Sequence, residues 1–136
     1  MKISRKYYSE FFIVLIIAAF AFNGCDDTLT VQDVDNKTIP ASNVSFSQHI
    51  YPVFQVKCIF CHNATDPDGG LDLTTYSAAT ADLNVIFPGD PETSRLVWTI
   101  EARAGISPMP PIGYRTLTKN QVDGVKTWIR EGAKNN

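Results

Sequence analysis

An uninterrupted apolar run over residues 11–22 follows a basic start with Lys2, Arg5 and Lys6. A helix that crosses a bilayer needs about 20 apolar residues, so this run is too short to span one. A basic start followed by a short apolar run is typical of a secretory signal peptide. We therefore predict a signal peptide over residues 1–24, with an uncleaved N-terminal anchor as the alternative.

The residues after the apolar run are Phe22-Asn23-Gly24-Cys25, which place a small residue directly before a cysteine. This resembles the cleavage site of a bacterial lipoprotein, in which the cysteine becomes the acylated N-terminus. A lipid on Cys25 would hold the mature protein at a membrane surface without a spanning helix. We expect an exported, membrane-anchored lipoprotein of the bacterial cell envelope, on the periplasmic side or at the surface.

Residues 25–43 are polar and acidic, and their apolar residues follow no period. Such a composition is typical of a flexible linker, so we predict an acidic tether between the lipid and a folded domain. A short edge strand over residues 31–34 is the alternative.

Helical patterning begins at residue 44 and continues to the end of the chain at residue 136. Ser45 is placed to cap a helix that runs towards Cys58, provided that Pro52 lies in its first turn. Asp90, Pro91 and Glu92 have the residue types of a helix start, which predicts a second helix to about residue 103. A turn rich in glycine and proline separates these helices at residues 66–70.

The last predicted helix has the clearest boundaries. Thr118 and Gln121 form a capping box at its start, and Gly132 is a natural stop. Gly124 costs this helix about 1 kcal/mol relative to alanine, which a close helix crossing would justify. No segment alternates with the period of a strand, so we predict an all-α domain of about three to five helices over residues 44–136.

The chemistry of the chain is concentrated in one pentapeptide, Cys58-Ile59-Phe60-Cys61-His62. The C-x-x-C-H pattern is the attachment motif of c-type haem. Two thiols on one helical turn can bond the two vinyl groups of a haem, and the adjacent imidazole then lies under the iron. A thioredoxin-like dithiol, a zinc site and a structural disulfide are the alternatives; the first expects a βαβ setting, and the second lacks a second cysteine pair.

A second axial ligand for such an iron is offered by Met109, in the stiff segment Ser107-Pro108-Met109-Pro110-Pro111. The other methionine, Met1, lies in the predicted signal peptide. Pairing of histidine with methionine is a standard arrangement in cytochromes c. The rival ligand is His49, which is predicted on the helix that enters the motif and so on the proximal side.

The charge of the chain limits its partners. Three of the 12 basic residues and one of the 14 acidic residues precede Cys25, which leaves a formal charge of −4 on the predicted mature chain. No basic block stands out, so nucleic-acid binding is not expected. An acidic surface favours a redox partner with a basic docking face.

These residues resemble a class I-type cytochrome c, and more narrowly the planctomycete-type cytochrome c domain, over about residues 44–133. The similarity rests on the C-x-x-C-H motif and on the elements Gly69-Gly70-Leu71, Pro88-Gly89-Asp90-Pro91 and Met109-Pro110-Pro111. The resemblance implies a small all-α fold around one covalent haem c. It also implies Cys58 and Cys61 as attachment points, with His62 as the proximal and Met109 as the distal iron ligand.

With both axial positions filled, one-electron exchange is the remaining chemistry of such an iron. We therefore predict a membrane-tethered electron carrier that is not an enzyme. The alternatives are a haem enzyme accessory or gas-responsive haem protein with a displaceable Met109, and a haem-stabilised adaptor.

Overall fold

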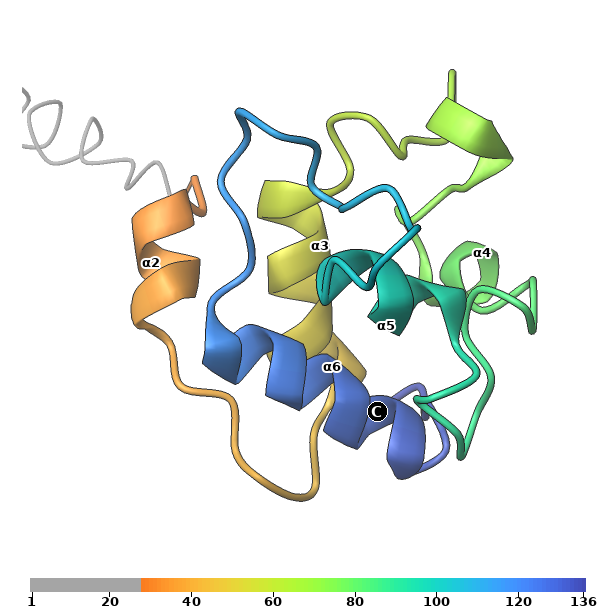
Figure 1. The fold of residues 1–136 in the computed structure, drawn as a ribbon. Coiled ribbons are helices and arrows are strands. Elements are labelled where there is room, and N and C mark those ends of the chain that lie inside the picture. Colours follow the sequence, from red (N-terminus) through yellow and green to blue (C-terminus); the bar gives the residue numbers. More distant parts are fainter. Residues whose placement is uncertain (1–27) are drawn as a thin grey trace, which may run out of the picture.

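The computed structural model describes residues 28–136, so the predicted signal peptide and Cys25 lie outside the described residues. Within this range the chain forms helices joined by loops, with no strand (Figure 1). The elements are α2 (Val31–Asn36), the π-helical turn η1 (Phe46–Ile50), α3 (Tyr51–Lys57), the 3₁₀ turn η2 (Asp68–Gly70), α4 (Tyr76–Ala79), α5 (Arg95–Ile100) and α6 (Lys119–Arg130). The predicted all-α fold is confirmed.

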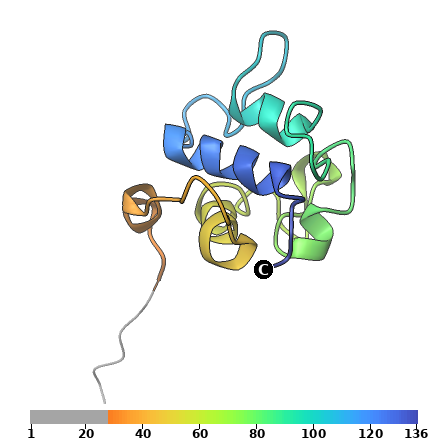
Figure 2. The same ribbon diagram turned by 90° about the horizontal axis from the view of Figure 1, so that it is seen from below.

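The hydrophobic core lies where α6 crosses η1 and packs against α5. Figure 2 shows α6 running between α3 and α5. Trp128 of α6 is fully buried, and its ring lies 5.4 Å from the ring of Phe46 at the start of η1. Phe54 of α3 packs edge-on against the same Phe46 ring. None of the helices over residues 28–136 has the length and apolar character that crossing a membrane requires.

The two ends of α6 are built as the sequence predicts. The Thr118 hydroxyl accepts from the Gln121 backbone N–H, and the Gln121 side chain accepts from the Thr118 backbone N–H, which completes the capping box. At the other end, Gly132 has a φ of +100° and Ala133 donates its N–H to the Trp128 carbonyl. This is a Schellman stop, which satisfies the last carbonyls of the helix.

The segment that leads into the cysteine motif starts at the predicted cap but is not one regular helix. Ser45 accepts from the Gln48 N–H, and the first turn, η1, is π-helical. Regular α3 then begins at Tyr51, with Pro52 in its first turn, where a missing N–H costs no hydrogen bond.

The predicted helix start at Asp90 is wrong. Residues 90–93 form turns, and α5 runs only from Arg95 to Ile100, after Ser94. The fully buried Ser94 hydroxyl donates to the Asp90 carbonyl and accepts from the Phe87 N–H, so it closes the turn instead of capping the helix. A turn and a helix start share the same residue types here, which explains the error.

The predicted flexible tether differs from the structure over its described part. Residues 31–36 form α2, with a capping box between Thr30 and Asp33, and no strand forms there. Val34 and Ile39 are buried in the core, and the Ile39 backbone exchanges two hydrogen bonds with the Asn120 side chain. This segment is therefore part of the folded domain, because α6 satisfies its backbone polar groups and the core buries its apolar side chains.

The close approach at Gly124 also has a different partner from the one expected. A Cβ at this position would lie 2.6 Å from Ile39 Cγ2, so the space that glycine provides is filled by the segment after α2. The expected helix crossing is not what Gly124 accommodates.

Candidate functional site

The cysteine motif continues the chain directly from the C-terminal end of α3. Cys58 is the C-cap of that helix and donates its N–H to the Phe54 carbonyl at 2.9 Å. The N–H groups of Cys61 and His62 both donate to the Cys58 carbonyl, at 3.1 and 2.9 Å. These bonds fold the motif into tight turns, which keep its three chemical groups on one local framework.

The imidazole of His62 is oriented by the loop that follows it. Its Nδ1 lies 3.1 Å from the carbonyl oxygen of Asp68, and a carbonyl can only accept, so Nδ1 carries the proton. Asp68 in turn donates its N–H to the Cys61 carbonyl, which closes the loop. The lone pair of Nε2 is left to bind a metal, and a hydrogen bond on the other nitrogen is the usual way in which proteins orient a histidine ligand.

The two thiols are free and have raised pKa values. Burial raises the pKa of Cys58 to about 12, against a smaller opposing effect of Lys57. Burial, and then the charge of Asp68, raise the pKa of Cys61. Redox-active dithiols depend on a lowered pKa, so this pair lacks the electrostatics of the thioredoxin-like alternative.

The motif opens into a large cavity of about 740 Å³, within the range of proteins' cofactor pockets. Both cysteines and His62 line it, and so does Met109, from the loop between α5 and α6. The rest of the wall is largely apolar and comes from α3, from α5 and from the loops before and after α5. It includes Val56, Leu71, Leu73, Val85, Leu96, Ile100, Ile106 and Leu117. The structure thus brings together all four of the described residues that the sequence singles out.

Met109 is held in place from α5. Its backbone N–H donates to the Thr99 carbonyl at 3.0 Å, and Pro110 after it is buried. In Figure 1 this loop lies at the same end of the domain as the chain that leaves α3. A thioether and an imidazole on the wall of one cavity are the donor set of a haem iron with His/Met ligation. No group of three or more His, Cys, Asp or Glu side chains gathers around a metal-sized site between residues 28 and 136.

Comparison with protein families gives the same answer. Residues 58–113 match the family model described as Planctomycete cytochrome C. This match supports a planctomycete-type cytochrome c domain in the chain. The matched segment begins at Cys58 and includes Met109, whereas α2, α3 and α6 lie outside it. Comparisons with curated proteins and with solved structures found no match.

Ion pairs distinguish three arginines, Arg95, Arg103 and Arg115, as partners for an anionic group in the cavity. Arg95 lines the cavity and has no ion-pair partner among residues 28–136. Arg103 pairs with Glu92 and Glu101, and Arg115 lies 3.6 Å from Asp35. Arg95 is therefore the arginine available to an anionic group in the cavity.

His49, the rival ligand predicted from the sequence, lies away from the large cavity. His49 lines a small separate cavity beside α2, and its Nδ1 accepts from the Ser45 N–H. Burial, and then the charge of Lys37, lower the pKa of His49. Tyr114 lines the large cavity, whereas Trp98 and Tyr76 are not among its lining residues.

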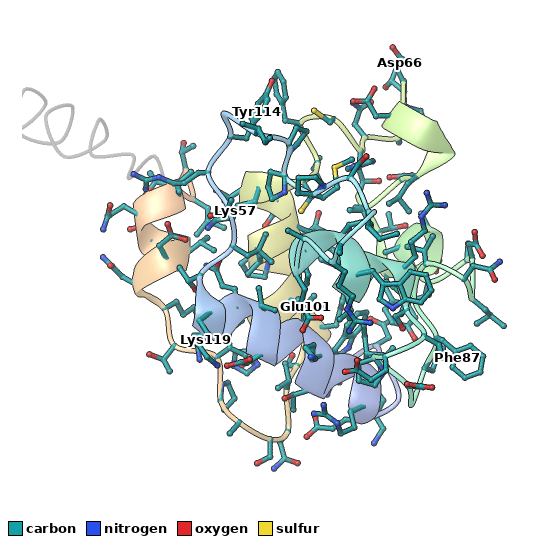
Figure 3. All side chains as sticks on the ribbon, in the orientation of Figure 1. Lys57, Asp66, Phe87, Glu101, Tyr114 and Lys119 are labelled. Carbon is teal, nitrogen blue, oxygen red and sulfur yellow. The ribbon has the colours of Figure 1, made fainter. Side chains whose placement is uncertain are left out.

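Lys57 is the lining residue that the sequence reasoning overlooks. Its side chain is only 1% exposed, and its Nζ lies 2.6 Å from a carboxylate oxygen of Asp35. It also donates to the Thr116 carbonyl and to Gln121 Oε1 (Figure 3). Its place directly before Cys58 could have drawn attention to it, but nothing local to the sequence indicates its partners.

Proposed function

We propose that this protein is a one-electron carrier that holds a single haem c. The observation that carries the proposal is the meeting of Cys58, Cys61, His62 and Met109 on one cavity of about 740 Å³. The match of residues 58–113 to a cytochrome family supports it, because cytochrome c domains bind haem and transfer electrons.

Each residue has a role in this proposal. Cys58 and Cys61 form the two thioether bonds, and His62 offers Nε2 to the iron while the Asp68 carbonyl holds its Nδ1–H. Met109 supplies the second axial ligand from the opposite loop, and Arg95 is available to a haem carboxylate. The bound haem supplies one-electron exchange between Fe(II) and Fe(III).

The polypeptide determines how that exchange proceeds. The apolar wall excludes water, which favours the less charged reduced state, and a methionine ligand raises the reduction potential relative to two histidines. If His62 and Met109 both held the iron, the bound haem would have no open position for a substrate. The protein would then be an electron carrier and not an enzyme.

The test is to produce the full chain in a host that attaches haem c and to record the pyridine haemochrome spectrum and the intact mass. We expect one haem per chain and a low-spin spectrum in both oxidation states, without carbon monoxide binding. The matched control is the Cys58→Ala/Cys61→Ala variant, which should lack covalent haem. A colourless wild-type protein with the mass of its amino acids alone overturns the proposal.

We further propose that the carrier is exported and anchored by a lipid on Cys25. A basic start, a short apolar run and a glycine before the cysteine support this, and cytochrome c domains are usually exported. Its acidic surface would suit a redox partner with a basic docking face. Intact mass of the membrane fraction, compared with that of Cys25→Ala, tests the anchor; an equal lack of any diacylglycerol addition would exclude it.

A further inference from the structure

The side chain of Lys57, a lining residue of the haem cavity, carries a buried ammonium group. Lys57 is the residue before Cys58, it lines the cavity, and its side chain is 1% exposed. A charge removed from water in this way is costly unless an opposite charge and hydrogen bonds compensate it. Its environment therefore has to supply a carboxylate.

That carboxylate comes from α2. Asp35 lies 2.6 Å from Lys57 Nζ, and no other carboxylate of residues 28–136 forms an ion pair with Lys57. The hydrogen bond from Lys57 holds the pKa of Asp35 below its ordinary value, against the opposing effect of burial. Gln121 Nε2 donates to the same carboxylate at 3.1 Å, so Asp35 stays ionised and fixed in place.

The contact is part of a broader docking of α2 on the domain. Gln121 Nε2 also donates to the Val34 carbonyl, and the Val34 side chain is buried. Figure 3 shows Lys57 on the side of α3 nearer α2. When α2 is docked, the Lys57 charge is neutralised; when α2 is displaced, the cavity wall carries an unpaired positive charge.

We propose that α2 is an electrostatic part of the haem site: through the Asp35–Lys57 pair it lowers the reduction potential, and the oxidised protein holds α2 more tightly than the reduced protein does. The inference rests on the proposed function. The oxidised site carries one more positive charge than the reduced site, so an uncompensated cation at the wall destabilises the oxidised state more. The second half follows from linkage, because docking and oxidation must change each other's equilibrium equally.

The first experiment measures reduction potentials of the haem-loaded full chain by spectroelectrochemistry. Asp35→Asn removes the carboxylate charge but keeps an oxygen acceptor, and should raise the potential. Lys57→Gln should lower it, and the double variant should return towards wild type. The matched control is Asp123→Asn, which removes the same charge from an exposed carboxylate on α6 that pairs with Lys119.

The second experiment measures amide hydrogen exchange of residues 31–36 in the two oxidation states. We expect slower exchange in the oxidised wild-type protein and a smaller difference in Asp35→Asn. If the equilibrium constant for α2 opening differs tenfold between the oxidised and reduced proteins, the reduction potentials of the docked and undocked forms differ by 59 mV. The exchange rates and the potentials can therefore be checked against each other.

The outcomes separate the two proposals. A chain without haem overturns the proposed function itself. A haem-loaded protein in which Asp35→Asn and Lys57→Gln both have the potential of Asp123→Asn overturns the role of α2. Equal exchange of residues 31–36 in both oxidation states would also overturn it.

Discussion

The two walls of the haem cavity are built in different ways. One wall, here called the α3 wall, is the cysteine motif at the C-terminal end of α3. Phe54 of that helix is buried in the core, and backbone hydrogen bonds continue from Phe54 through Cys58 to His62. The facing wall, here called the loop wall, is the segment over residues 101–117, which contains no helix. Ile112 of this loop is 95% exposed and Tyr114 is 57% exposed.

This difference places covalent attachment of the haem on one wall and coordination of its iron by methionine on the other. Both thiols and the proximal imidazole lie on the wall whose geometry the core determines. Met109 lies on the wall held by fewer contacts, chiefly its N–H bond to the Thr99 carbonyl. Haem retention should therefore depend on the α3 wall, whereas the axial bond and the potential should depend on the loop.

Met109→Ala should have the largest effect, and it should change the coordination of the iron but not the attachment of the haem. The variant should keep its covalent haem, because both thioether bonds lie on the other wall. It should lose the absorption band of the iron–thioether bond, bind carbon monoxide and have a lower reduction potential, since the methionine ligand raises it. Intact mass, absorption spectra and redox titration check these three points. Loss of the haem itself would show that the loop is needed for attachment, and an unchanged spectrum would remove Met109 as the ligand.

Phe54→Ala tests the rigidity of the α3 wall. Phe54 is 1% exposed, and removing a buried phenyl ring typically costs 3–5 kcal/mol of unfolding free energy. Denaturant unfolding of the haem-loaded protein measures the loss. A cost below about 1 kcal/mol would mean that the core does not hold this wall.

A region can be predicted from sequence when the residues that contact it lie close to it in the chain. The boundaries of α6 are set by residues within the helix and its caps, such as Thr118, Gln121 and Gly132, so they can be predicted from local pattern. The site residues can be predicted for the same reason, because Cys58, Cys61 and His62 are neighbours in the chain. Met109 lies far along the chain, and its proline-rich segment together with the resemblance to a known domain predicts its place beside them.

The α2 segment could not be predicted in this way. Its acidic composition is that of a linker, and its partners Asn120 and Gln121 lie more than 80 residues along the chain. Lys57 was overlooked for the same reason, since a lysine at the end of a helix is usually solvated. The local sequence of a segment does not name the distant helix on which it docks.

Gly124→Ala is expected to have a smaller effect than the loss of Phe54. A methyl group at this position would meet Ile39 Cγ2 at 2.6 Å, and such overpacking costs about 1–3 kcal/mol. Alanine also improves helix propensity by about 1 kcal/mol, so the net loss should be about 1 kcal/mol. Thermal unfolding measures it, and the matched background is Ile39→Ala. There the same substitution should stabilise the protein, and a loss in both backgrounds would contradict the role of Ile39.

Acid below about pH 4 should weaken the attachment of α5, which leads into the loop wall, to α6. Lys126 of α6 pairs with Glu92 and Glu101 across this contact, and Arg103 pairs with the same two carboxylates from the α5 side. Burial alone would raise the pKa of Glu101, but hydrogen bonds from Lys126 and Arg103 outweigh it and lower the pKa. A lowered pKa in the folded state means stability that is present above about pH 5 and is lost as the pH falls below about 4. Unfolding midpoints of wild type and Glu101→Gln should therefore converge as the pH falls, and a constant difference would contradict this account.

Ile112→Ala completes the comparison with the smallest expected effect. Its side chain is 95% exposed on the loop wall, and exposed substitutions usually change stability by less than about 0.5 kcal/mol. The variant should unfold like wild type and keep the thioether band, because the Thr99 carbonyl still holds the Met109 backbone. The difference between the unfolding free energies of Ile112→Ala and Phe54→Ala measures how unequally the two walls contribute to the stability of the fold. A loss of more than 1 kcal/mol would mean that Ile112 is buried in the haem-loaded protein, and that the loop wall closes more firmly than its contacts indicate.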